Sequence, residues 1–189
     1  MTARHPIATF IFRLGGAALL DPSAFEDVER DKGATGQALL VVLLSSAAAG
    51  IGARGWNQGA DQGLFAFAGF SAVALIAWAA WALLTFEIGS RLLPTGETRT
   101  DVGELLRTLG FASAPGLLRV LGILPGVTTP VFVLTSVWML ATMVMAVRQA
   151  LDYTSTARAL AVCGIGWMLS ILVAVLLGLL VGPTLVGAV

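Results

Sequence analysis

Long apolar runs separated by short polar links fill most of the sequence. No charged residue occurs in residues 33–53, 62–86, 130–147 or 159–189. A helix needs about 20 apolar residues to cross roughly 30 Å of hydrocarbon, and all four runs are close to that length or longer. Each run therefore predicts a membrane-spanning helix. The first is rich in Ser, Ala and Gly, so we expect it inside the bundle, where small residues let backbones approach.

The N-terminal residues have Arg4 in front of an apolar stretch. In "MTARHPIATFIFRLGGAALL", Arg13 interrupts the apolar stretch, and the charged "DPSAFEDVERDK" that follows offers no small-x-small cleavage site. Pro6 to Leu20 is predicted to be a retained amphipathic helix at the membrane interface. Ser23 and Glu26 stand three apart, which is the capping-box pattern that starts a short helix. Its other signs are an i,i+4 pair of Glu26 with Arg30 and an apolar stripe of Phe25 and Val28.

A fifth apolar segment, Arg107–Gly126, decides the topology. The chain has 11 Lys and Arg residues. If this segment crosses, only Arg54 and Arg119 lie outside, which leaves nine inside. If it does not cross, Arg148 and Arg158 move outside and Arg119 moves inside, which leaves eight inside. The positive-inside rule favours the crossing.

The same segment is predicted to be short, kinked at Pro115 and buried among the others. A neighbouring helix can satisfy the carbonyl that the proline frees. Arg119 lies twelve residues past Arg107, about 18 Å along a helix, where a long side chain can reach outward. Asp61 is a candidate partner for it.

The predicted fold is therefore all-α: a polytopic integral membrane protein with five transmembrane helices and an N-terminal interfacial amphipathic helix. Residues 1–35 form the cytosolic or interfacial segment, and residues 36–189 form the bundle. The expected spans are approximately 36–53, 63–87, 107–125, 130–150 and 158–182. The N-terminus is expected inside and the C-terminus outside.

Composition supports a membrane protein. The chain is 57% hydrophobic and 12% charged, about half the charged fraction of soluble domains. Its formal net charge of zero argues against nucleic-acid binding, which needs a basic patch. Cys163 is the single cysteine, so no intrachain disulfide can form. Arg far outnumbers Lys, and Ala and Gly are abundant, which favours a bacterial cytoplasmic membrane.

No motif predicts a reaction. "GIGARG" matches G-x-G-x-x-G but ends a span instead of opening a soluble βαβ unit, so helix packing is the preferred interpretation. "GFSA" resembles an intramembrane serine-protease motif, yet the only histidine is His5, at the N-terminus. One His and one Cys cannot build a typical transition-metal site. We expect a non-enzyme without a cofactor or metal.

Polar residues near the spans are the candidate sites. Glu87 with Arg91 and Arg148 with Asp152 stand at i,i+4 and predict surface ion pairs. Hydroxyls within the spans are expected to bond between helices. Gly178 and Gly182 form a G-x-x-x-G pattern that packs helices within the chain or between copies, so a homo-oligomer stays open. The candidate partner-contact or intramembrane polar residues are Glu87, Asp101, Glu104, Arg107, Arg119, Arg148 and Asp152.

Four segments resemble the Yip family of Ypt/Rab-interacting membrane proteins, in its bacterial branch. They are "DPSAFEDVERDKGATGQALLVVLLSS", "ELLRTLGFASAPGLL", "LGILPGV" and "VWMLATMVMAVRQALDYTSTARALAV". The resemblance implies five spans with a cytosolic N-terminus, and it transfers no catalytic residue. The eukaryotic members act in vesicle traffic and bind Rab-type GTPases. This chain lacks their long N-terminal region and their Tyr-Gly-Pro-type motif, so Rab binding is not expected.

Three functions compete. The first is a non-enzymatic scaffold or adaptor that organises membrane proteins or lipids, with the bilayer and other membrane proteins as partners. The second is a small transporter or channel component. The third is an accessory subunit of a larger membrane complex.

Overall fold

The computed structural model of the chain describes residues 6–54, 63–94 and 101–186, and the regular elements within these ranges are all helical. This confirms the predicted all-α class. The chain begins with α1 (Pro6–Ala18), α2 (Pro22–Arg30) and a 3-10 turn, η1 (Lys32–Ala34). The longer elements are α3 (Thr35–Arg54), α4 (Gly63–Glu87) with its π-helical extension η3 (Ile88–Leu92), α5 (Val102–Ala112), the 3-10 helix η4 (Ala114–Ile123), α6 (Thr128–Ala150) and α7 (Thr156–Val186).

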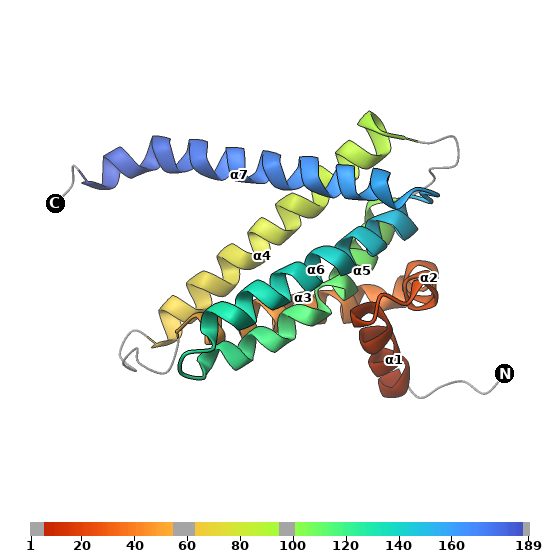
Figure 1. Ribbon diagram of the computed structural model, residues 1–189, viewed down its shortest axis with the longest axis horizontal. Coiled ribbons are helices and arrows are strands. Elements are labelled where there is room, and N and C mark those ends of the chain that lie inside the picture. Colours follow the sequence, from red (N-terminus) through yellow and green to blue (C-terminus); the bar gives the residue numbers. More distant parts are fainter. Residues whose placement is uncertain (1–5, 55–62, 95–100, 187–189) are drawn as a thin grey trace.

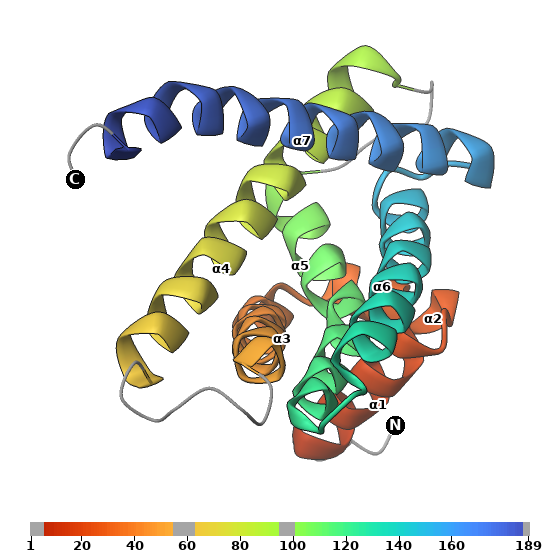
Figure 2. The ribbon, with the colours of Figure 1, turned by 60° about the vertical axis from the view of Figure 1, so that its left-hand side comes forward.

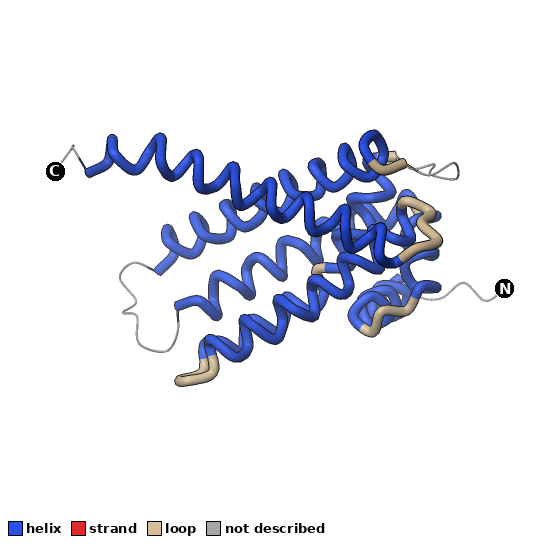
Figure 3. The backbone as a smooth tube through the Cα atoms, turned by 45° about the horizontal axis from the view of Figure 1, so that its top comes forward, coloured by secondary structure: helices blue, strands red, loops and turns tan. Residues whose placement is uncertain are grey.

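Five long segments run back and forth between two ends of the molecule (Figures 1 and 3). In chain order they are α3, α4 with η3, α5 with η4 (the third segment), α6 and α7. One end holds α1, α2, η3, the start of α5 and the link 151–155, and we call it the polar end. The other holds the last turn of α3, the first turn of α4 and the turn 124–127, and we call it the distal end. Helix α7 starts at the polar end and runs toward the distal side (Figure 1).

The five segments contact one another in a ring. Helix α3 lies between α4 on one side and the α5–η4 segment on the other (Figure 2). The α5–η4 segment packs on α6, α6 packs on α7, and α7 crosses α4 to complete the ring. Helices α1 and α2 pack outside the ring, against α5 and α6.

Small residues bring α3 and the third segment into close contact. Ala38, Ser45 and Gly52 recur every seven residues, so they share one face of α3. Their facing residues on the third segment are Gly110, Gly116 and Arg119. A Cβ on Gly110 would lie 2.8 Å from the Ala38 Cβ, and one on Gly52 would overlap the Arg119 carbonyl oxygen. The close packing predicted for the small residues of α3 is therefore present on this face, but Leu39, Leu40, Leu43 and Leu44 are 46–50% exposed, so α3 lies only partly inside the bundle. Within "GIGARG", Gly52 is used for helix packing.

The third segment changes helix type at Ser113. It begins earlier than the predicted residue 107, at Val102, and runs as an α-helix to Ala112 before the 3-10 stretch that contains Pro115. The Thr142 hydroxyl of α6 donates a 2.6 Å hydrogen bond to the Ala112 carbonyl. The α-helix is thus interrupted just before Pro115, and a neighbouring helix satisfies a carbonyl at the break, as predicted.

Burial of this segment is incomplete. Leu105, Leu109 and Phe111 of α5 are almost fully buried, but Leu118 and Leu121 of η4 are exposed. The prediction that the whole segment lies inside the bundle is therefore wrong for η4, because its 3-10 turn keeps one apolar face turned outward.

The outer surface of the long helices is apolar. Exposed large hydrophobic side chains include Leu43 on α3, Leu134 on α6 and Ile171 on α7. Three described helical stretches are long and apolar enough to cross a membrane, Lys32–Ala53, Leu75–Leu92 and Thr128–Ala150. The third segment is divided between α5 and η4, and the described side chains of α7 contribute the apolar stretch Thr156–Leu172.

The start of α2 differs from the prediction. Asp21, not Ser23, is the N-cap: its carboxylate accepts from the Ser23 backbone N–H at 3.0 Å and from the Ser23 hydroxyl at 2.8 Å. Pro22 occupies the first helical turn, where its missing N–H costs nothing. The predicted pair of Glu26 with Arg30 is confirmed at 2.9 Å.

Candidate functional site

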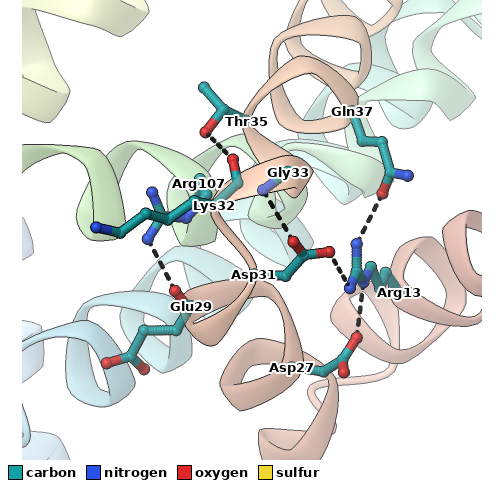
Figure 4. Close-up of polar contacts among 9 residues, drawn as sticks. All are labelled: Arg13, Asp27, Glu29, Asp31, Lys32, Gly33, Thr35, Gln37 and Arg107. Atoms are coloured by element: carbon teal, nitrogen blue, oxygen red, sulfur yellow. Dashed lines mark hydrogen bonds and ion pairs between the residues drawn. The ribbon is translucent and has the colours of Figure 1, made fainter.

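Arg13 joins the first three helices at the polar end (Figure 4). Its side chain is 5% exposed, and its Nε and Nη2 lie 2.7 Å from Asp27 Oδ2 and 2.8 Å from Asp31 Oδ2. Its Nη1 donates to Gln37 Oε1 at 3.0 Å. The sequence marked Arg13 only as a break in an apolar stretch. Its three acceptors, 14 to 24 residues away along the chain, were not foreseen.

The charges of this cluster stabilise one another. Burial disfavours the charged form of Arg13, but the hydrogen bonds and attraction of Asp27 and Asp31 outweigh burial and raise its pKa. The Arg13 hydrogen bond in turn lowers the pKa of Asp31, against a smaller opposing effect of burial. Asp31 also accepts from the Gly33 N–H at 2.8 Å, so it caps η1. Helix α1 is therefore held onto the bundle by charge as well as by apolar packing.

Arg107 ties α5 to the end of α2 (Figure 4). It is 4% exposed, and its Nη2 donates to the Glu29 carbonyl oxygen at 2.8 Å. That carbonyl belongs to the last turn of α2, where a cation is favoured by the helix dipole. The structure thus places this candidate residue in an internal contact, away from a partner-binding surface.

Asp101 and Glu104 form a capping box at the start of α5. Glu104 N donates to Asp101 Oδ1 at 2.8 Å, and Asp101 N donates to Glu104 Oε2 at 3.0 Å. The pair fixes the start of α5 at the polar end. Glu104 also lies near Glu29, whose pKa is raised to about 7 by burial and then by the negative charges of Asp152 and Glu104.

The predicted ion pair of Arg148 with Asp152 is wrong. Helix α6 ends at Ala150, and Asp152 adopts a left-handed backbone conformation with φ 51°. Asp152 is therefore no longer on the helical face of Arg148. Arg148 instead donates to the Tyr153 carbonyl oxygen at 3.3 Å and to Thr156 Oγ1 at 3.1 Å, which shapes the α6–α7 link.

Tyr153 connects that link to α4. Its hydroxyl lies 2.9 Å from the Gly89 carbonyl oxygen and 2.8 Å from the Leu93 carbonyl oxygen, at the π-helical end of α4. Arg158 lies over the Tyr153 ring, 5.8 Å from its centroid. Nearby, the predicted pair of Glu87 with Arg91 is confirmed at 3.0 Å on an exposed face. Sequence reasoning missed Tyr153, although it is the only tyrosine of the chain.

Arg119 lies apart from the polar end, in the distal half. Its Nε donates to Thr135 Oγ1 at 3.3 Å and its Nη2 to Ser136 Oγ at 2.9 Å. Its suggested partner Asp61 lies outside the described residues. The suggested helix contacts of Gly178 and Gly182 fall in the part of α7 whose side-chain surroundings also lie outside the described residues.

The comparison of the chain with protein families agrees with the membrane-type helical architecture. A family model described as the Yip1 domain matches residues 16–178. The chain belongs to the Yip1 domain family. No curated protein and no solved structure matches it. The Yip1 match begins within α1 and ends within α7, so it covers the polar-end contacts of Arg107 and Tyr153 and the distal Arg119.

No cluster of three or more His, Cys, Asp or Glu side chains in residues 6–54, 63–94 and 101–186 could hold a metal ion. The charged side chains at the polar end instead fix helices to one another and leave an ordered charged surface around them.

Proposed function

We propose that this Yip1-domain chain is a non-enzymatic membrane scaffold or adaptor that organises other membrane proteins or lipids, with its polar end as the partner-binding surface. The observation that carries the proposal is that α1 and α2 are held rigidly outside the bundle. Arg13 contributes three hydrogen bonds to this anchoring, and Trp138 of α6 donates a 2.7 Å bond to the Ala18 carbonyl. A surface fixed in this way binds a partner without first being ordered.

The polar end also exposes charged side chains, although Asp27 and Arg30 already pair with Arg13 and Glu26. Asp27, Arg30, Lys32 and Asp152 are exposed, and they come from α2, η1 and the α6–α7 link. Charges spread over separate segments but gathered at one end favour a protein partner with complementary charge. Their mixed sign argues for a shaped protein surface over simple attraction to anionic headgroups.

Five crossings of the bilayer, with the polar end in the cytosol, complete the proposal. The five long segments alternate in direction and expose apolar side chains, as a bilayer requires. The positive-inside rule assigns the polar end to the cytosolic side. The basic residues described there are Arg13, Arg30, Lys32, Arg91, Arg107, Arg148 and Arg158. We place the chain in the bacterial cytoplasmic membrane.

Site-specific photo-crosslinking tests the adaptor role. Crosslinking residues at Ser23 and Thr154, both exposed at the polar end, should capture the same membrane proteins in cells. A crosslinker at Pro125, exposed in the distal turn, should not capture them. The Arg30→Glu and Lys32→Glu double variant should reduce the capture several-fold while leaving the fold intact. Equal capture from Pro125, or no capture from the polar end, would exclude this surface as the docking site.

An accessory subunit of a larger complex would give the same crosslinking result as an adaptor. The second candidate function is a small transporter or channel component. The observation that favours a transporter is a cavity of about 400 Å³ between the helices. A transported solute should raise the melting temperature of the purified protein in a concentration-dependent way. A scaffold should show no such shift across a panel of solutes.

A further inference from the structure

A cavity of about 400 Å³ lies inside the ring of helices, in the size range of small-molecule sites, which is roughly 300–1,000 Å³. Residues of α3, α4, α6 and α7, together with Ser113 and Arg119, line it. Its walls are mainly apolar and include Val42, Leu140 and Met143. The cavity is partly open, so a molecule in the membrane can reach it.

Arg119 is a cation that faces this cavity, and its contacts among the described residues are with neutral groups. Its hydrogen bonds go to the hydroxyls of Thr135 and Ser136, and its guanidinium lies 5.4 Å from the centroid of the Phe132 ring. No carboxylate of the described residues forms an ion pair with it. A charge held within a membrane bundle is costly, and an anion beside it would be stabilised.

Two buried hydrogen-bond donors line the same cavity. Trp81 is only 7% exposed, and its Nε1 has no acceptor among the described residues. The same holds for the Nε1 of Trp78, its neighbour one turn away on α4. The rings of these two tryptophans form part of the cavity wall on the α4 side. Ser45 and Ser46 add hydroxyls to the opposite wall.

The charged and apolar parts of the cavity are separated along the helices. The Arg119 backbone lies against Gly52, two residues from the end of α3 at the distal end. Its acceptor Ser136 is seven residues before Met143, which is about 10 Å along α6 at 1.5 Å per residue. The cation therefore lies on the distal side and the apolar wall continues toward the membrane interior.

We propose that this cavity binds an anionic phospholipid, with its acidic headgroup on Arg119 and an acyl chain along Val42, Leu140 and Met143. The polarity gradient matches a lipid that enters from the leaflet at the distal end. Arg pairs with phosphate through parallel hydrogen bonds, which favours this headgroup over a zwitterionic one whose own cation competes. The proposal rests on the membrane-spanning part of the proposed function and is independent of partner binding at the polar end.

Native mass spectrometry of the full chain with added lipids tests the proposal. Phosphatidylglycerol should bind at least tenfold more tightly than phosphatidylcholine of the same chain length. Arg119→Gln should weaken phosphatidylglycerol binding by about tenfold or more, as loss of a charged hydrogen bond implies. Arg30→Gln removes a positive charge from the exposed polar end and should leave the binding unchanged.

Two further measurements complete the test of lipid binding. Leu140→Trp fills the cavity without changing charge and should weaken binding of phosphatidylglycerol as strongly as Arg119→Gln. This variant tests the proposal on its own in case Arg119→Gln does not fold. Glycerol phosphate, which has the headgroup charge without chains, should bind at least tenfold more weakly than the lipid. Equal binding of both lipids, no effect of either variant, or equally tight binding of glycerol phosphate would overturn the proposal. None of these results alters crosslinking from Ser23 or Thr154, so the two proposals fail separately.

Discussion

At the residue scale, the chain uses its few charges mainly to position helices. Arg13 and Arg107 are both 4% exposed, and each joins elements that are far apart in the sequence. Desolvation of a guanidinium is costly, and the three acceptors around Arg13 offset that cost. The carboxylates of Asp27 and Asp31 remain about half exposed, so solvent lowers the cost of burying their partner.

The first prediction concerns Arg13. Arg13→Gln should lower the free energy of unfolding by about 1–3 kcal/mol, because two carboxylates and Gln37 lose their shared donor. Hydrogen exchange should increase selectively in α1 and at the start of α3. The matched control is Arg30→Gln, which removes an exposed i,i+4 pair of about 0.3–0.5 kcal/mol. Equal effects of the two variants would show that the Arg13 cluster does not hold α1.

The second prediction concerns pH. The pKa of Glu29 is raised to about 7 in the folded state, from 4.5, by burial and by Asp152 and Glu104. Since the folded state binds the proton more tightly, stability should fall as pH rises from about 5 to about 7 and then level off. Glu29→Gln should flatten this slope in thermal unfolding, whereas Glu26→Gln, on the exposed side of α2, should keep it. A wild-type melting temperature that rises over this range would contradict the assignment.

Contacts between residues close together in the sequence could be predicted, whereas contacts between residues far apart in the sequence could not. The capping box of Asp101 with Glu104 and the pair of Glu87 with Arg91 were predictable, because helical spacing alone places these groups together. The pair of Arg148 with Asp152 failed at a helix end that hydropathy does not mark. The contacts of Arg13 and Tyr153 depend on tertiary packing, which no local spacing reveals.

At the element scale, the hydrophobic pattern locates the long helices well. The predicted ranges 36–53, 63–87 and 130–150 lie within two residues of α3, α4 and α6. The exception is the third segment, where hydropathy predicts one helix and the structure has two. Pro115 cannot continue the hydrogen-bond ladder, and the apolar composition on both sides of it hides the change from α5 to η4.

The break in this segment gives the third prediction. Thr142→Val keeps the shape of the side chain but removes the hydroxyl that donates to the Ala112 carbonyl, so stability should fall by about 1–3 kcal/mol. Thr108→Val is the matched control. Thr108 is equally buried, but its hydroxyl bonds only to carbonyls of its own helix, so the change should be nearly neutral. Denaturation of both variants in the same detergent gives the comparison, and equal losses would show that the α6 hydroxyl does not support the break.

At the scale of the whole molecule, packing differs between the two ends. The largest fully buried side chains gather toward the polar end, including Phe25, Leu105, Val147 and Leu151. Toward the distal end, α7 diverges from the other helices (Figure 1), and the cavity lies between α3, α4, α6 and α7. A well-packed end that fixes the helices and a looser end that admits a membrane molecule suit a protein with separate sites for a protein partner and a lipid.

The number of crossings gives the last prediction, which depends on the third segment. Single cysteines at Lys32, Pro125 and Thr154, all exposed, can be introduced in a Cys163→Ala background. If the α5–η4 segment crosses the bilayer, an impermeant thiol reagent added from outside should label Pro125→Cys and spare Lys32→Cys and Thr154→Cys. If that segment stays on the cytosolic side, Pro125→Cys should be protected and Thr154→Cys labelled, because α6 then runs in the opposite direction. The positive charge gathered at the polar end favours the first pattern, since the second would place Arg148 and Arg158 outside.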